Sequence, residues 1–331
     1  MTKNIKKKER VAWADLCKGL LITLLMFSHL IWLSLSRYEV DNQVINVIGN
    51  YSVIWGCFFM SCFFLISGFF SNFNKPAKDF IWSQFKGLIF PALVLLALNC
   101  IPHLNYSHFI DRFFLFGGGQ WFLAALFLSK IFLWSCIKWI KNKESILAIL
   151  LVMSFAGKFL DDANLFPNYW YHRNFMHFTL FLGLGYYYKD FLLKKTVGIV
   201  SSIAFTLTIV LLYMMKFHVP SVVSVFNETL IEHPLSIWLS ITGSISCIHL
   251  CKFIGHNSVL EYLGKVSLIV YIYHLIFLTH SISALANSLN DCTLIDSVIQ
   301  ISMIITSTLV FSCFVAKVMD FKYLKWMKGS F

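Results

Sequence analysis

The sequence predicts an all-α, polytopic integral membrane protein with about ten transmembrane helices and both termini in the cytoplasm. Three observations lead to this prediction. Hydrophobic residues make up 58% of the 331 residues and charged residues only 13%, about half the charged fraction of an average soluble domain. Apolar stretches long enough to cross a bilayer recur along the chain. The segments between them alternate between many and few basic residues.

Ten stretches reach or approach the roughly 20 mostly apolar residues that a bilayer-spanning helix needs. The fifth and sixth are short, and we expect them to be tilted, broken or partly re-entrant. A basic segment at 1–12, one transmembrane domain at 13–317 and a basic tail at 318–331 account for the whole chain. The predicted spans are 13–36, 49–71, 86–102, 120–140, 145–160, 175–190, 197–216, 234–252, 267–289 and 296–317.

Loop charge predicts the orientation of these spans. Twenty Lys and Arg residues lie at the termini and in the loops that this topology places inside, whereas five lie in external loops. Such a bias is typical of cytoplasmic segments. A nucleic-acid site would instead need a continuous basic face, so the net charge of +11 does not indicate one. The basic N-terminus precedes a full-length span without a small-residue cleavage site, which predicts a retained helix.

The nine cysteines show no metal-binding spacing. The chain has no CxxC motif, and Cys247 and Cys251 lie one helical turn apart within an apolar stretch. We therefore predict no metal site and expect the cysteines to be small buried side chains in helices.

The first predicted helix carries three ionisable residues, Asp15, Lys18 and His29, each of which is costly in a bilayer. Lys18 and His29 are eleven residues apart, which places them within about 20° of one helix face and about 16 Å apart along its axis. Asp15 can pair with Lys18. A lysine can bind a phosphate group, and a neutral imidazole can act as a general base. Together they suit a ligand with a charged head and a long arm, such as acyl-CoA. The alternative is a snorkelling Lys18 and a His29 that hydrogen-bonds a neighbouring helix.

These residues also carry a family resemblance. The pattern Arg10-x4-Asp15-x2-Lys18-Gly19-x9-His29 resembles the opening signature of membrane acyltransferase family 3. The lysine at position 18 of this pattern resembles the form found in the family's fucose 4-O-acetylase-like branch. Further motifs follow in the family's order over about residues 10–320. They are FFLISGF at 63–69, Lys86-x4-Pro91, WFL at 121–123, and Ser267-x3-Tyr271-x2-His274.

The resemblance implies an O-acyltransferase, with acetyl-CoA as cytoplasmic donor. The acceptor is then a sugar hydroxyl of a cell-surface or exported glycan or a lipid-linked saccharide, and the location is the bacterial inner membrane. It implies that His29 is catalytic, that Arg10, Lys18 and Lys86 bind the cofactor, and that no metal takes part. The remaining candidates for the substrate site are Asp15, Ser67, Trp121, Arg173, Tyr271 and His274.

Several alternatives stay open at this point. His274 suits a substrate site and a structural hydrogen bond equally. Arg173 and His177, with their aromatic neighbours, suit either sugar stacking or an interfacial belt. Lys130 lies within the fourth span without an identifiable partner. A transporter or flippase for a glycan or lipid-linked intermediate is the main rival function, although the matched, broken half-repeats of transporters are not evident.

The charge bias generates a topology prediction. Reporter fusions after residues 78, 142 and 325 should report a cytoplasmic location, and fusions near 110 and 226 an external one. The measurement is the paired activity of phosphatase and fluorescent-protein reporters. A cytoplasmic result at 110 would contradict the ten-helix topology.

Overall fold

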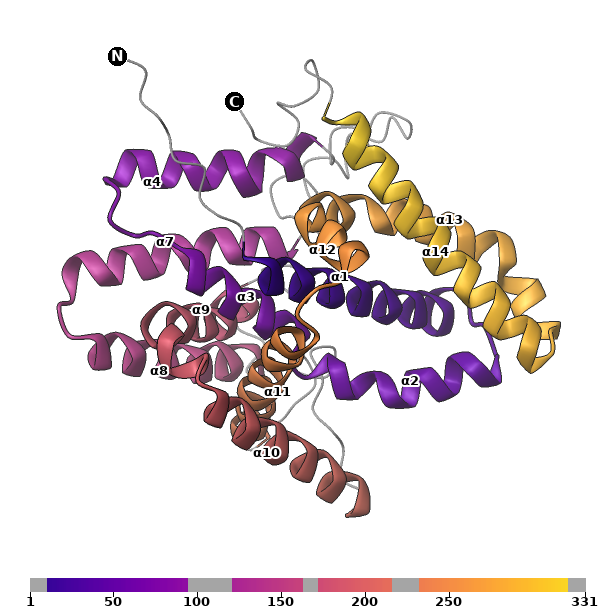
Figure 1. Cartoon of the computed structure of the whole chain (residues 1–331), viewed down its shortest axis with the longest axis horizontal. Coiled ribbons are helices and arrows are strands. Elements are labelled where there is room, and N and C mark those ends of the chain that lie inside the picture. Colours follow the sequence, from indigo (N-terminus) through magenta and orange to yellow (C-terminus); the bar gives the residue numbers. More distant parts are fainter. Residues whose placement is uncertain (1–10, 95–120, 163–171, 216–231, 321–331) are drawn as a thin grey trace.

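The computed structural model describes residues 11–94, 121–162, 172–215 and 232–320, drawn in colour in Figure 1. Of these residues 89% are helical and none lies in a strand, which confirms the predicted all-α class. The described elements are α1 (Ala12–Trp32), η1 (Leu33–Arg37), α2 (Gln43–Gly56), α3 (Phe59–Phe70), α4 (Ala77–Gln84), η2 (Phe85–Ile89), α7 (Trp121–Trp139), α8 (Lys143–Asp162), α9 (His172–Leu192), α10 (Lys195–Met214), α11 (His233–Ile254), α12 (Ser258–Lys265), α13 (Ser267–Asp291) and α14 (Leu294–Val318).

Seven helical stretches within the described residues are long and apolar enough to cross a membrane, and each coincides with a predicted span. The helices α8 and α9 coincide with the fifth and sixth predictions; they have 20 and 21 residues but are more polar. The third predicted span, 86–102, extends beyond the described residues. The total of ten and the cytoplasmic termini therefore remain predictions. The seven stretches are Ala12–Arg37, Gln43–Phe70, Trp121–Trp139, Lys195–Met214, His233–Ile254, Ser267–Asn290 and Leu294–Val318.

The second span begins earlier than predicted and is broken. It starts at Gln43, and α2 and α3 are separated at Cys57 and Phe58. Two hydroxyls of α11 bind the carbonyls at the break: Ser240 donates to the Cys57 oxygen at 2.6 Å and Ser244 to the Phe58 oxygen at 3.3 Å. The Phe58 oxygen also accepts the Cys62 N–H at 2.8 Å. Backbone polar groups at a helix break inside a bilayer need partners from the protein, and α11 contributes to them.

The helix α12, which the sequence analysis treated as loop, packs against α1 through two glycines. A Cβ atom on Gly19 of α1 would collide with the Leu260 carbonyl of α12, and one on Gly264 of α12 would collide with the Asp15 carbonyl of α1. Each helix thus presents a glycine to the other's backbone, the close approach that small residues permit. This crossing lies at the end of α1 that carries Asp15 and Lys18, as Figure 1 shows for the two helices.

A second reciprocal glycine crossing joins α3 to α9. Added Cβ atoms on Gly68 and Gly185 would collide with the carbonyls of Leu182 and Leu65, respectively. Gly68 belongs to the FFLISGF motif, so this motif forms a helix–helix contact. At the edge of the bundle α13 and α14 lie side by side (Figure 1).

The α1–α12 crossing generates a stability prediction. Gly264→Ala should lower the free energy of unfolding by about 1–3 kcal/mol, because the added Cβ forces the two backbones apart. The measurement is the midpoint of thermal unfolding of the purified protein in detergent. Gly87→Ala is the matched control, since a Cβ on Gly87 meets nothing within 4 Å. Equal midpoints for the two variants would contradict the tight crossing.

Candidate active site

Two histidines from distant parts of the sequence lie together between α1 and α13. The ring centroids of His29 and His274 are 5.1 Å apart, with the planes tilted by 41°. His274 is fully buried, and His29 is half-buried. The sequence suggested each residue separately; the structure brings them into one site.

The hydrogen bonds of His274 fix the tautomer of its neutral ring. Its Nδ1 lies 2.8 Å from the carbonyl oxygen of Tyr271 and 3.1 Å from that of Val270. Carbonyl oxygens only accept, so Nδ1 donates, and in a neutral ring Nε2 carries the lone pair. That buried Nε2 has no partner in the described part of the chain. His274 therefore makes a structural hydrogen bond through Nδ1 and offers a proton acceptor at Nε2.

His29 is held in place by its neighbours. Ser28 accepts a hydrogen bond from Trp55 Nε1 at 2.8 Å and donates to the Leu24 carbonyl at 3.1 Å, which ties α1 to α2 beside the site. Trp32 presents its ring to the imidazole at 6.4 Å between centroids. Within the described residues we find no hydrogen bond from the His29 ring to a neighbouring helix.

Tyr271 and Trp121 connect the histidine pair to α7. The Tyr271 hydroxyl accepts a hydrogen bond from the Phe122 backbone N–H at 3.3 Å, one of the donors that a helix leaves unpaired in its first turn. The Tyr271 ring centroid is 6.0 Å from that of His274. Trp121 stacks on Phe178 of α9 at 5.8 Å. The WFL motif thus starts α7 beside the site.

The other end of α1 is cationic. Lys18 Nζ lies 3.9 Å from Asp15 Oδ1, and about a third of the Lys18 side chain is exposed. Lys18 also lies 5.9 Å from the centre of the Phe70 ring, and Lys189 of α9 lies 4.9 Å from the same ring. Lys189 was not singled out from the sequence, where it is one of several basic residues in a loop cluster. The unbroken α1 helix separates Lys18 from His29 by about 16 Å.

A further pair of lysines lies on α7 and η2. Lys130 donates a hydrogen bond to Gln84 Oε1 at 3.1 Å, which supplies the partner that the sequence could not identify. Lys86 lies 5.0 Å from the centre of the Trp82 ring. The α4–η2 segment thus carries Lys86 and, through Gln84, binds Lys130 of α7.

The remaining predicted site residues are placed as follows. Ser67 is half-buried on α3, and its carbonyl accepts a hydrogen bond from Ser71 at 2.7 Å. Arg173 lies in α9, but its side chain is outside the described residues, as is all of Arg10. His29, His274 and Tyr271 therefore lie near one end of α1. Lys18 and Lys189 lie near the other end.

An acyltransferase-domain family model matches residues 11–317. The chain belongs to acyltransferase family 3. No curated protein and no solved structure matches it. The family match confirms the resemblance found in the sequence and, with the apolar helices, identifies a multi-pass membrane protein with an acyltransferase domain. The acetyl donor and the glycan acceptor remain predictions.

This family 3 acyltransferase has a second buried polar cluster that the sequence did not reveal. Ser154 Oγ of α8 lies 3.0 Å from His177 Nδ1 of α9 and 3.0 Å from His233 Nε2 of α11. A hydroxyl has one proton, so Ser154 donates to one ring and accepts from the other. The side chain of His177 is only 3% exposed. His177 therefore belongs to a buried contact among three helices. The interfacial belt, one of the two alternatives that the sequence left open, does not apply to this residue.

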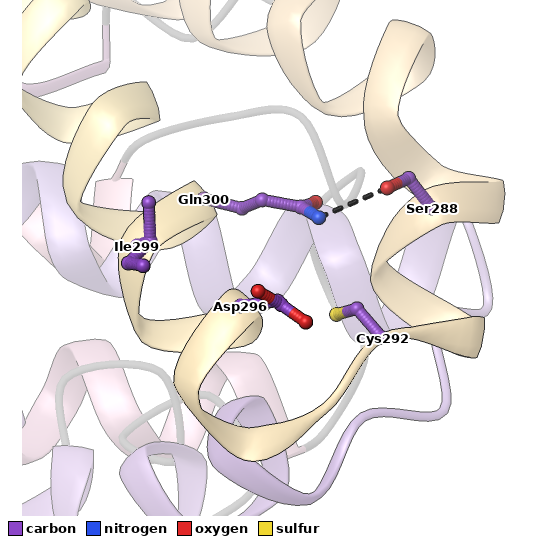
Figure 2. Close-up of a pocket in the computed structure, with 5 residues that line it drawn as sticks. All are labelled: Ser288, Cys292, Asp296, Ile299 and Gln300. Atoms are coloured by element: carbon purple, nitrogen blue, oxygen red, sulfur yellow. Dashed lines mark hydrogen bonds between the residues drawn. The ribbon is translucent and has the colours of Figure 1, made fainter.

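A surface pocket lies away from these residues, at the turn between α13 and α14. Its volume is about 320 Å³. Figure 2 shows the Gln300 amide bonded to Ser288, at 2.9 Å, and the side chains of Asp296 and Cys292 facing each other. None of the predicted site residues lines it. Its lining residues are Ser288, Cys292, Asp296, Ile299 and Gln300.

Proposed function

We propose that the protein is a membrane O-acetyltransferase that moves an acetyl group from cytoplasmic acetyl-CoA to a sugar hydroxyl of a cell-surface or exported glycan or a lipid-linked saccharide. The observation that carries this proposal is the pairing of His29 with His274, about one CoA arm away from Lys18 along a single helix. Membership in acyltransferase family 3 supports the reaction class.

The donor end of the proposed site is the cationic end of α1. Lys18 and Lys189 both lie near the Phe70 ring, and two ammonium groups close to one ring suit the phosphates of CoA. Asp15 pairs with Lys18 and so orients its ammonium. Lys86 serves as a further phosphate ligand from η2. From there the pantetheine arm runs along α1 and presents the thioester to His29.

The chemistry proposed at His29 is general-base catalysis. The acceptor oxygen attacks the thioester carbonyl, its proton passes to a His29 ring nitrogen, and the CoA sulfur leaves and takes up a proton. In the alternative order, His29 first carries the acetyl group itself. The neutral His274, with its lone pair on Nε2, lies beside the ring that receives the proton.

A transporter or flippase is the second candidate. It would use the same buried polar residues to line a path, without forming a bond to His29. Family membership favours the transferase, and transfer of label from donor to acceptor separates the two directly.

The donor end generates a prediction for Lys18. Lys18→Ala should raise the KM for acetyl-CoA roughly 3–10-fold, since a charged hydrogen bond at a part-exposed site contributes about 1 kcal/mol. Lys18→Arg should stay close to wild type because it keeps the charge. The measurement is transfer of radiolabelled acetyl from acetyl-CoA in membranes. Lys143→Ala, which removes a half-exposed lysine paired with Glu144, is the control, and equal KM values for Lys18→Ala and the control would rule out the phosphate contact.

The histidine pair generates the central prediction. His29→Gln should lower transfer of labelled acetyl by about 10²–10⁴-fold, because the amide can hydrogen-bond but cannot take a proton. The variant should insert and elute from size exclusion like wild type. His280→Gln, a change at an exposed histidine of α13, is the matched control and should remain active.

Near-normal transfer by His29→Gln would leave His29 a structural role only and would direct the search for the base to His274. Loss of transfer in both His29→Gln and His280→Gln would point to a general sensitivity of the bundle and would not support a base at position 29.

A further inference from the structure

Three buried thiols from two helices meet in the interior of the bundle, and a fourth buried thiol from a third helix lies beside them. The sulfur atoms of Cys17 on α1 and of Cys247 and Cys251 on α11 all lie within 4.8 Å of one another, and the Cys17–Cys247 pair is 3.9 Å apart. Cys62 on α3 is a fourth buried thiol beside this group, and its thiol donates a hydrogen bond to the Ser244 carbonyl of α11 at 3.7 Å. All four are at most 5% exposed. The sequence gave no sign of this group because its members are up to 234 residues apart.

We propose that this thiol cluster binds a single thiophilic d¹⁰ cation, Zn²⁺ or Cu⁺. The site is independent of the proposed acetyl transfer. It goes beyond the sequence prediction that the chain has no metal site.

The sulfur spacing supports a mononuclear site. Metal–sulfur bonds of about 2.3 Å in a tetrahedron place the sulfurs about 3.8 Å apart, and the Cys17–Cys247 separation of 3.9 Å is close to this value. The other two separations among Cys17, Cys247 and Cys251, at most 4.8 Å, require sub-ångström shifts toward a common centre. A disulfide would engage two sulfurs and leave the others without a role, and a cluster with its own sulfides would hold the cysteines farther apart.

The ligand chemistry selects the ion. Soft thiolates prefer Cu⁺ and Zn²⁺, whereas Mg²⁺ and Ca²⁺ prefer oxygen ligands, and the three side chains of this group offer only sulfur. Each coordinating thiol loses its proton as its metal–sulfur bond forms, so binding releases protons and involves no electron transfer.

The cluster lies where three helices must be held together. Cys17 is two residues from Asp15, which packs against Gly264, and Cys247 lies one turn beyond the Ser244 hydroxyl that binds the α2–α3 break. An ion here therefore joins α1 to α11 and α3 next to the cationic end of α1. Small buried side chains could pack at this crossing without any ion, and the test separates these two cases.

The test uses the purified full chain, reduced and metal-free, in detergent micelles. Zn²⁺ and Cu⁺ are added separately, excess ion is removed by desalting, and bound metal is measured by mass spectrometry. We expect one ion per chain for the preferred cation and a loss of affinity of more than ~10-fold in Cys17→Ala and in Cys247→Ala, as for removal of a ligand. Cys136→Ala, a buried thiol of α7 outside the cluster, is the matched control and should bind like wild type.

Thermal unfolding provides a second readout, because an ion that binds only the folded protein raises the midpoint. The unfolding midpoints of wild type and Cys136→Ala should rise with the ion, and the midpoint of Cys17→Ala should not. If Cys17→Ala does not fold, Cys251→Ala is tested in its place. Competition between the two ions then assigns the preferred one. Absence of stoichiometric metal in wild type, equal binding by Cys17→Ala, or a predominant Cys17–Cys247 disulfide in protein alkylated at lysis would each overturn the proposal.

Discussion

The structure depends on the close crossing of α1 and α12. Gly19 and Gly264 each lie against the other helix's backbone, so neither helix can slide or rotate without a collision of main-chain atoms. Because α1 is a continuous helix from Ala12 to Trp32, fixing its first turns also fixes the direction of His29, three turns farther on. The lysine that precedes Gly19 and the histidine eleven residues later are thereby held at a set separation. A side chain larger than hydrogen at position 19 would disturb both ends at once.

The second constraint is the satisfaction of polar groups in an apolar surrounding. Hydroxyls of α11 bind the carbonyls at the α2–α3 break, and Ser154 binds two imidazoles from α9 and α11. In a bilayer each such group would be costly without its partner. These contacts therefore hold the helices in one arrangement, whereas the apolar faces alone could pack in several.

The sequence predicted those features that depend on one segment at a time. The apolar spans follow from length and hydropathy, and the common face of Lys18 and His29 follows from helix geometry, so both could be read directly. The break at Cys57 follows a single glycine, Gly56, inside an apolar stretch, which by itself does not distinguish a break from a continuous helix, and α12 is too short to stand out in a loop. The proximity of His274 to His29 depends on the packing of α1 on α13, which are separated by more than 200 residues. Such tertiary contacts leave no local pattern, and for the same reason the thiol cluster was missed.

The paired imidazoles constrain how a proton can be handled. His274 donates through Nδ1 to carbonyls of its own helix, so only its Nε2 can accept a proton. Two cationic rings with centroids 5.1 Å apart repel each other strongly where water is scarce, so the pair holds one proton more easily than two. If His29 takes the proton of an attacking hydroxyl, a neutral His274 beside it offers a lone pair to the new imidazolium. In the proposed reaction, the backbone carbonyls that bind His274 Nδ1 therefore leave Nε2 as the nitrogen of this ring that can take a proton.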